Sequence, residues 1–172
     1  TQYLNGPYSA ASAPFLSVSN NRVTGKVTLD YKPTDHTLVY ATYSRGYRSG
    51  NFNAGLHYLF QGLNQGAYAS PETINAYEVG FKSELFDRSL RLNGALFQYD
   101  YKNQQFEDVQ GISSVLVNAG KSRLRGAELE VVLAPVAGLQ LSLSGLYLDA
   151  KYRELTLQGH DLAGNTMISS PE

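Results

Sequence analysis

Residues 22–31 alternate between apolar and polar side chains with a period of two. Successive side chains of an extended strand point to opposite faces, so this pattern predicts a β-strand with two different surroundings. One face holds Val23, Gly25, Val27, Leu29 and Tyr31, and the other holds Arg22, Thr24, Lys26, Thr28 and Asp30.

The same reasoning predicts five further strands along the chain, and no segment shows the spacing of an amphipathic helix. Several of them are longer than the ~5–6 residues usual in soluble sheets. They reach the ~9–11 residues that a tilted strand needs to cross a bilayer. The predicted strands cover about 22–31, 36–45, 74–85, 90–103, 115–133 and 139–152.

Short and long connections alternate between these strands. Short turns are expected at 32–35, 86–88 and 134–138, where Pro, Gly and Asp favour tight reversals. Long connections are expected at 46–70 and 104–114, and we expect loops before 22 and after Leu155. In an antiparallel meander all short turns then lie at one end, as in outer-membrane barrels. The fold expected is all-β: a meander of about six long strands.

The segment 74–85 carries charges on one face and apolar side chains on the other. Tyr77, Val79 and Phe81 are expected to face lipid, with Glu78 and Lys82 facing a polar interior. The segment 115–133 has the same character. The polar residues expected to face the lumen are Glu78, Lys82, Glu128 and Glu130.

The segment 90–103 has apolar residues of both parities, so one phase cannot send all of them to lipid. A β-bulge near Gly94 would shift the register by one residue; alternatively, one apolar set lines the interior. Tyr99 and Tyr101 are interpreted either as an interfacial aromatic girdle or as plain packing. The two parities are Leu90, Leu92 and Leu96 against Ala95, Phe97, Tyr99 and Tyr101.

Composition narrows the class of protein. The chain has 172 residues, a net charge of −1 and no cysteine. This charge gives no sign of a nucleic-acid partner, and disulfides or thiolate metal sites are excluded. No apolar run approaches the ~20 residues of a transmembrane helix. If the chain spans a membrane, it must do so as part of a closed barrel.

Candidate catalytic and metal-binding residues are few. His36, His57 and His160 fall in a turn and two loops, without a partner at metal-ligand spacing. Paired glutamates such as Glu128 and Glu130 are better explained as solvated lumen charges than as an acid–base pair. No nucleophile elbow or phosphate-binding loop occurs. We therefore expect no enzyme activity, no metal and no cofactor.

The first long connection mixes aromatic residues with Gly and Asn, which is typical of a binding surface rather than a linker. Arginine can bind carboxylate or catecholate oxygens with forked geometry, and aromatic rings can stack on planar groups. The alternative is that these arginines only serve the barrel rim. The candidate ligand-binding residues are Arg45, Tyr47, Arg48, Asn51, Phe52 and Asn53.

A second cationic group is expected near the outer end of the fifth strand. Lys121, Arg123 and Arg125 either contact lipid phosphates or are ordinary rim or lumen charges.

Four segments together resemble one family, the TonB-dependent outer-membrane receptors. They follow one another in the order and spacing typical of that family, and the resemblance covers about 22–172. The segments are LVYATYSRGYRSGNFNAG (38–55), PETINAYEVGFKSEL (71–85), LRLNGALFQYDYKNQQ (90–105) and NAGKSRLRGAELE (118–130).

The resemblance implies a 22-stranded transmembrane β-barrel closed by an N-terminal plug, in the outer membrane of a Gram-negative bacterium. It implies uptake of a scarce nutrient, most often a ferric siderophore, energised by the TonB complex through the plug. Outer-membrane lipid and lipopolysaccharide would surround the wall. No plug, TonB box or C-terminal aromatic strand is found within 1–172, so we expect part of a barrel domain. A passive porin-like barrel and a soluble β-sandwich binding module remain alternatives.

Overall fold

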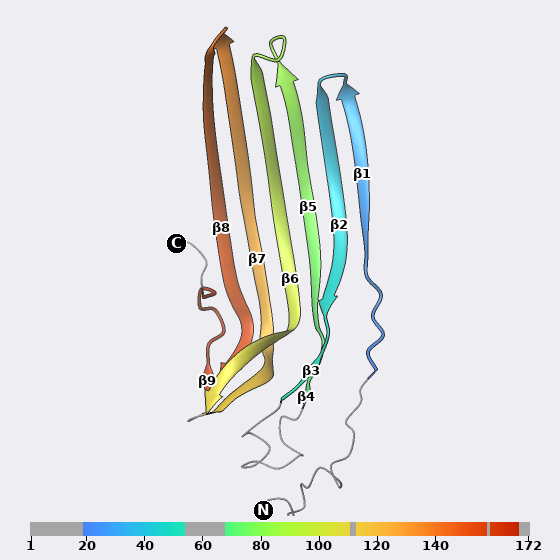
Figure 1. The fold of residues 1–172 in the computed structure, drawn as a ribbon, viewed down its shortest axis with the longest axis vertical. Helices are drawn as coiled ribbons and strands as arrows, with labels where there is room; N and C mark the ends of the chain where they lie inside the picture. Colours follow the sequence, from blue (N-terminus) through green and yellow to red (C-terminus); the bar gives the residue numbers. More distant parts are fainter. Residues whose placement is uncertain (1–18, 54–67, 111–112, 158, 169–172) are drawn as a thin grey trace, which may run out of the picture.

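The structure is a computed structural model that describes residues 19–53, 68–110, 113–157 and 159–168. Six long strands lie side by side in one curved wall (Figure 1). They are β1 (Gly25–Thr34), β2 (Thr37–Arg48), β5 (Glu72–Leu85), β6 (Leu90–Gln110), β7 (Ser113–Val136) and β8 (Leu139–Leu157). Three two-residue strands complete the fold: β3 (Asn51–Phe52) pairs with β4 (Tyr68–Ala69), and β9 (His160–Asp161) pairs with β8.

All neighbouring strands are antiparallel and follow chain order, which confirms the predicted all-β meander. The tight connections lie together at one end of the wall, at the top in Figure 1. Phe86, Asp87 and Arg88 form one of them, with φ angles of 53°, 54° and 69°. No helix in the described part of the chain is long and apolar enough to cross a membrane.

The first tight turn lies at Asp35–His36 rather than over 32–35. β1 continues through Thr34 because its register with β2 shifts between Tyr31 and Thr34. Pro33 lies inside this irregular stretch. Proline has no backbone N–H, and at this position the β1–β2 ladder does not need one. The expected turn residues therefore form the end of a strand and a bulge.

The second long connection is a strand pair, so the loop expected at 104–114 is wrong. β6 extends to Gln110 and β7 begins at Ser113, with Phe106 opposite Val117 and Asp108 opposite Val115. Residues 104–110 are mostly polar and do not alternate with apolar residues, so the sequence does not predict a strand there. The register shifts around Gln104, beside Asn103, which has a φ of 53°. The ends of β6 and β7 turn aside from the wall below this point (Figure 1).

The β-bulge near Gly94, the first of the two alternatives for 90–103, is absent. β5 and β6 keep one register from Thr73–Lys102 to Leu85–Leu90, and Gly94 pairs directly with Phe81. A Cβ on Gly94 would lie 2.7 Å from Cε1 of Phe81, so the glycine leaves room for the phenyl ring. The second alternative therefore holds, and β6 is apolar on both of its faces.

Register assigns each residue of the wall to one of two faces, because directly paired residues point the same way. One face, here called the outward face, is nearly all apolar between the tight turns and the level of Tyr77. Its large side chains are strongly exposed: Leu29 is 72% exposed and Leu143 is 71% exposed. The outward apolar residues include Val27, Leu29, Tyr31, Val39, Tyr43, Tyr77, Val79, Phe81, Leu92, Leu96, Leu129, Val131, Leu141, Leu143 and Tyr147.

A soluble sandwich would have to cover this outward face with a second large sheet. The described residues contain only one further sheet, the two-stranded β3–β4 pair. On β5 the apolar stretch from Tyr77 to Leu85 would extend over ~26 Å at ~3.3 Å per residue. At the ~35–45° tilt of barrel strands this length spans a height of ~20 Å, close to the ~25 Å apolar band of an outer-membrane barrel.

Tyr99 and Tyr101 do not belong to an outward aromatic girdle. Tyr99 pairs with Ala76 and Leu124, which places it on the same face as Glu78 and Glu128. The outward tyrosines at this end of the apolar band are instead Tyr43, Tyr77 and Tyr147. The rings of Tyr43 and Tyr77 lie 5.2 Å apart. The girdle interpretation assigned the right residue type to the wrong face.

Candidate functional site: the inner face and the base of the long connections

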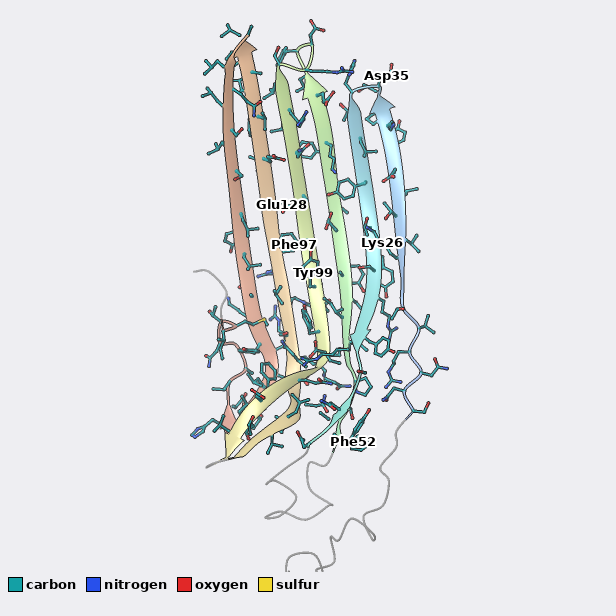
Figure 2. All side chains as sticks on the ribbon, in the orientation of Figure 1. Lys26, Asp35, Phe52, Phe97, Tyr99 and Glu128 are labelled. Carbon is teal, nitrogen blue, oxygen red and sulfur yellow. The ribbon has the colours of Figure 1, made fainter. Side chains whose placement is uncertain are left out.

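The four residues expected to face the lumen lie on one face of the wall, opposite the apolar band. Register places Glu78 and Lys82 of β5 on the same side as Glu128 and Glu130 of β7. Together with Asn93 and Ser144 they line a hollow of about 760 Å³. Glu128 lies midway along the wall (Figure 2). We call this the inner face.

Neutral donors hold two of the inner glutamates, Glu78 and Glu130. The Tyr40 hydroxyl donates a hydrogen bond of 2.7 Å to Oε1 of Glu78, and Asn93 Nδ2 donates one of 2.8 Å to Oε2 of Glu130. Hydrogen bonds to an ionised carboxylate are stronger than neutral ones and fix its position. This contact places Tyr40 on the inner face.

Acidic groups outnumber basic groups on the inner face between the tight turns and the level of Lys26. The acids are Asp30, Glu78, Glu84, Glu128 and Glu130, and the bases are Lys26, Lys32, Lys82 and Arg91. A charged surface of this kind suits a polar neighbour or an aqueous passage.

Aromatic rings cover part of the inner face. Phe97 and Tyr99 lie next to one another on β6 (Figure 2), with ring centroids 5.2 Å apart. A Cβ on Gly126, which pairs with Phe97, would lie 2.6 Å from Cζ of that ring. The second apolar parity of β6 therefore packs across neighbouring strands instead of facing lipid.

At the other end of the wall, Asn53 fastens the first long connection to β7. Its Nδ2 donates to the Leu116 carbonyl oxygen at 2.8 Å, and its Oδ1 accepts from the Leu116 N–H at 2.7 Å. Asn53 is only 7% exposed. The Asn53 amide thus takes the place of a neighbouring strand's backbone opposite Leu116, and both its N–H and its oxygen are engaged in these hydrogen bonds.

Asn118 and Gln105 form a second fastening beside the first. Asn118 Oδ1 accepts from the Ser70 N–H at 2.6 Å, and its Nδ2 donates to the Ser70 and Asn103 carbonyl oxygens, each at 2.8 Å. Gln105 Nε2 donates to the carbonyl oxygens of Ser49 and Ser70 at 3.1 Å and 2.9 Å. Both ends of the first long connection are therefore tied to the β6–β7 pair.

The structure separates the six candidate ligand-binding residues. Arg45 and Tyr47 point outward, whereas Arg48 lies on the inner face opposite Glu72. Asn51 Oδ1 accepts from the Phe52 N–H at 3.0 Å. The Phe52 ring lies 5.0 Å from that of Tyr68 at the lower end of the fold (Figure 2).

Sequence reasoning named Asn53 as a ligand candidate and missed the roles of Gln105, Asn118 and Ser70. No local signal identifies such contacts, because the partners are far apart in sequence. In the sequence, the NAG segment at 118–120 indicates only the family resemblance.

The histidines contribute no metal centre in the described residues. His36 lies in the first tight turn and His160 in β9, while His57 lies outside the described residues. No three His, Asp or Glu side chains in the described ranges come together as a potential metal site.

Comparison with known families gives one match over nearly the whole chain. Residues 2–172 match the family model described as TonB dependent receptor-like, beta-barrel. The chain is 27% identical over 154 residues to the probable TonB-dependent siderophore receptor PiuA of Acinetobacter baumannii. That alignment covers 88% of this chain and 20% of PiuA.

Two solved structures show the same fold. The ferric yersiniabactin uptake receptor FyuA from Yersinia pestis superposes with a TM-score of 0.62 at 23% identity, over 82% of this chain and 21% of FyuA. BauA, the ferric preacinetobactin receptor from Acinetobacter baumannii, superposes with a TM-score of 0.57 at 25% identity, over 79% of this chain and 19% of BauA. The chain thus spans about a fifth of the length of these relatives.

Proposed function

The chain belongs to the family of TonB-dependent receptor β-barrels, and we propose that the complete protein imports a ferric siderophore or a similar iron complex. Members of this family are outer-membrane proteins of Gram-negative bacteria, so the wall lies in that membrane. The family consists of transport receptors, and we propose that this protein likewise catalyses no reaction. The observation that carries the proposal is the family match over residues 2–172, together with the similarity to the siderophore receptor PiuA.

In the proposed receptor this chain supplies part of the barrel wall. The outward apolar band contacts lipid, and the acidic inner face borders the lumen, where a plug would lie and would relay force from TonB. The tight turns lie on the periplasmic side and the long connections on the cell exterior, as in other outer-membrane barrels. The long connections are then the first part of this chain that an arriving iron complex meets.

The positions of the six candidate ligand-binding residues favour three of them as ligand contacts. We propose that Arg48, Asn51 and Phe52 contact the ligand, because they lie on the inner face or in β3, where the first long connection begins. Arg45 and Tyr47 point away from the lumen. Asn53 uses its amide on Leu116 and positions this base.

Iron uptake by the source bacterium tests the proposed function. The gene would be deleted, and uptake of ⁵⁵Fe supplied on a panel of catecholate, hydroxamate and phenolate siderophores would be measured. We expect uptake to fall for one class and to return when the full-length gene is restored. Unchanged uptake of every class would contradict the iron proposal.

A second measurement separates active transport from a passive porin. Uptake by the restored strain would be repeated after the proton gradient is collapsed with an uncoupler, or in a strain lacking TonB. TonB-dependent import should stop under both conditions. Uptake that continues would show passive diffusion and would contradict active, TonB-dependent transport.

A further inference from the structure

The polarity of the two faces reverses at the end of the wall that carries the long connections. Between the tight turns and the level of Tyr77, the outward face is apolar and the inner face carries the charges. Beyond Tyr77 the outward face carries charges instead, and the inner face becomes apolar and aromatic. The outward cations expected near the outer end of the fifth strand each form an ion pair with an acid there: Lys121, Arg123 and Arg125.

Six uncharged side chains make up the apolar part of the inner face beyond this level. They come from four neighbouring strands, β5, β6, β7 and β8, and each is partly exposed. Phe97 and Tyr99 lie between Glu128 and the end that carries the long connections (Figure 2). We call these six residues the uncharged panel: Ile74, Phe97, Tyr99, Tyr101, Leu124 and Leu148.

The uncharged panel faces the lumen and not the lipid, because the register places it on the same side as Glu78. A contiguous apolar surface that faces water marks a binding site. Aromatic rings stack on planar groups, and a tyrosine adds a polar hydroxyl. The hydroxyls of Tyr99 and Tyr101 form no hydrogen bond with another described residue, so both are available to a ligand. The panel therefore suits a planar ligand with a few polar atoms.

The charges around the panel indicate which ligands it favours. Its borders carry three acids and two bases: Glu72, Glu78 and Glu128, with Lys26 and Arg48. Lys26 lies on β1 at the edge of the sheet, and Arg48 is directly opposite Glu72. An anion that leaves water for this surface would lose hydration and gain few cations in return. A neutral ligand meets no such penalty.

We infer that the uncharged panel contacts the cargo and selects a neutral iron complex with aromatic groups over a complex with several negative charges. This inference rests on the proposed function, because it takes the cargo to be an iron complex. Arg48, Asn51 and Phe52 lie at the outer end of the same face. Cargo that passes these residues on its way inward meets the panel next.

Binding of three ferric complexes to the purified full-length receptor tests the inference. The probes are a neutral complex of a phenolate chelator, a neutral tris-hydroxamate complex without aromatic groups, and a trianionic tris-catecholate complex. Titration calorimetry would measure each Kd. We expect the phenolate complex to bind most tightly and the tris-catecholate complex roughly tenfold more weakly. A tris-catecholate or tris-hydroxamate complex that binds as tightly as the phenolate complex would overturn the inference.

A cation added to either face locates the charge selection. Ala76 lies directly opposite Tyr99, so Ala76→Lys puts a positive charge beside the panel. It should tighten binding of the tris-catecholate complex about tenfold and leave the phenolate complex nearly unchanged. The control Asn75→Lys adds the same charge one residue away on the outward face and should bind all three complexes like wild type. Unchanged affinities in a folded Ala76→Lys receptor would mean that another part of the protein covers the panel, which would overturn the inference.

A ring removed from either face locates the aromatic contact. Tyr99→Leu should weaken binding of the phenolate complex roughly fivefold and leave the tris-hydroxamate complex unaffected. The control Tyr77→Leu removes an outward ring and should bind like wild type. An equal loss in both variants would overturn the assignment to the panel.

Heat-dependent migration on a gel would check that each variant folds. If Ala76→Lys does not fold, Ser44→Lys takes its place, because Ser44 pairs with Ala76 on the same face. The outcomes also separate this inference from the proposed function. Binding of none of the three complexes would contradict both, whereas a preference for the tris-catecholate complex would leave iron uptake standing and overturn only the role of the panel.

Discussion

The two faces of the wall differ in what their side chains contact, although both contain many apolar residues. Outward residues such as Val79 and Leu96 are 51% and 60% exposed and have apolar neighbours. On the inner face, Glu78 is bonded to Tyr40, and Phe97 lies over Gly126. Apolar character alone therefore does not identify the lipid side. Exposure of large side chains and the absence of polar neighbours identify it.

β6 shows this difference most clearly, because both of its faces are apolar. Leu92 and Leu96 continue the outward band, whereas Phe97 and Tyr99 stack over the neighbouring strand on the inner face. The inner aromatic residues are accommodated by small residues opposite them: Gly126 faces Phe97, and Ala76 faces Tyr99. Complementary side-chain size across strands, rather than polarity, makes this packing possible.

The strongest test places an arginine on each face in turn. Leu143→Arg puts a charge in the outward apolar band and should lower the free energy of unfolding by ~2–4 kcal/mol. Ser144→Arg, one residue later, puts the same charge on the inner face and should be nearly neutral. Denaturant unfolding of the full-length receptor in lipid vesicles measures both. Equal losses would mean that the two faces are not distinguished by lipid.

Gly94→Val tests the uninterrupted register of β6. The added side chain would meet the Phe81 ring, because a Cβ already lies 2.7 Å from Cε1. Overpacking of this kind should cost roughly 1–3 kcal/mol of unfolding free energy. The double variant with Phe81→Ala should recover part of that loss. Additive losses would show that Phe81 does not cover Gly94.

Asn53→Ala tests the fastening at the base of the long connections. The Leu116 N–H and carbonyl would lose their amide partner, and one unsatisfied buried group costs ~1–3 kcal/mol. We expect hydrogen exchange of the Leu116 amide to become roughly ten times faster, while mid-wall amides stay protected. Asn51→Ala is the control, since the side chain of Asn51 accepts its hydrogen bond from the N–H of the adjacent Phe52. Unchanged exchange at Leu116 would contradict the role given to Asn53.

Tyr40→Phe should have the smallest effect. It removes the 2.7 Å hydrogen bond to Glu78 and keeps the ring, so the expected loss is about 1 kcal/mol of unfolding free energy. Thermal unfolding of the full-length receptor would detect it. In the Glu78→Gln background the same change should cost less, because the acceptor is no longer charged. An equal loss of unfolding free energy in both backgrounds would show that the Tyr40 hydroxyl does not interact with the charge of Glu78.

Patterns of period two predicted the wall well because each strand meets two different environments. Val27, Leu29 and Tyr31 could be assigned to one face from sequence alone, and so could Glu78 and Lys82 to the other. The strand pair beyond Lys102 could not be predicted, because Gln104–Gln110 is mostly polar and its partners are known only from the register. The Asn53 and Asn118 contacts join residues far apart in the chain and leave no local pattern.

The faces of β5 and β6 can be compared directly by site-directed spin labelling of the full-length receptor in lipid vesicles. These 172 residues contain no cysteine, so single cysteines can be introduced among them at Val79, Glu78, Leu92, Leu96 and Phe97. Labels at Val79, Leu92 and Leu96 should collide with oxygen dissolved in lipid, whereas labels at Glu78 and Phe97 should not. A reversal of that preference between Leu92 and Leu96 would place a bulge at Gly94 and contradict the continuous two-faced wall.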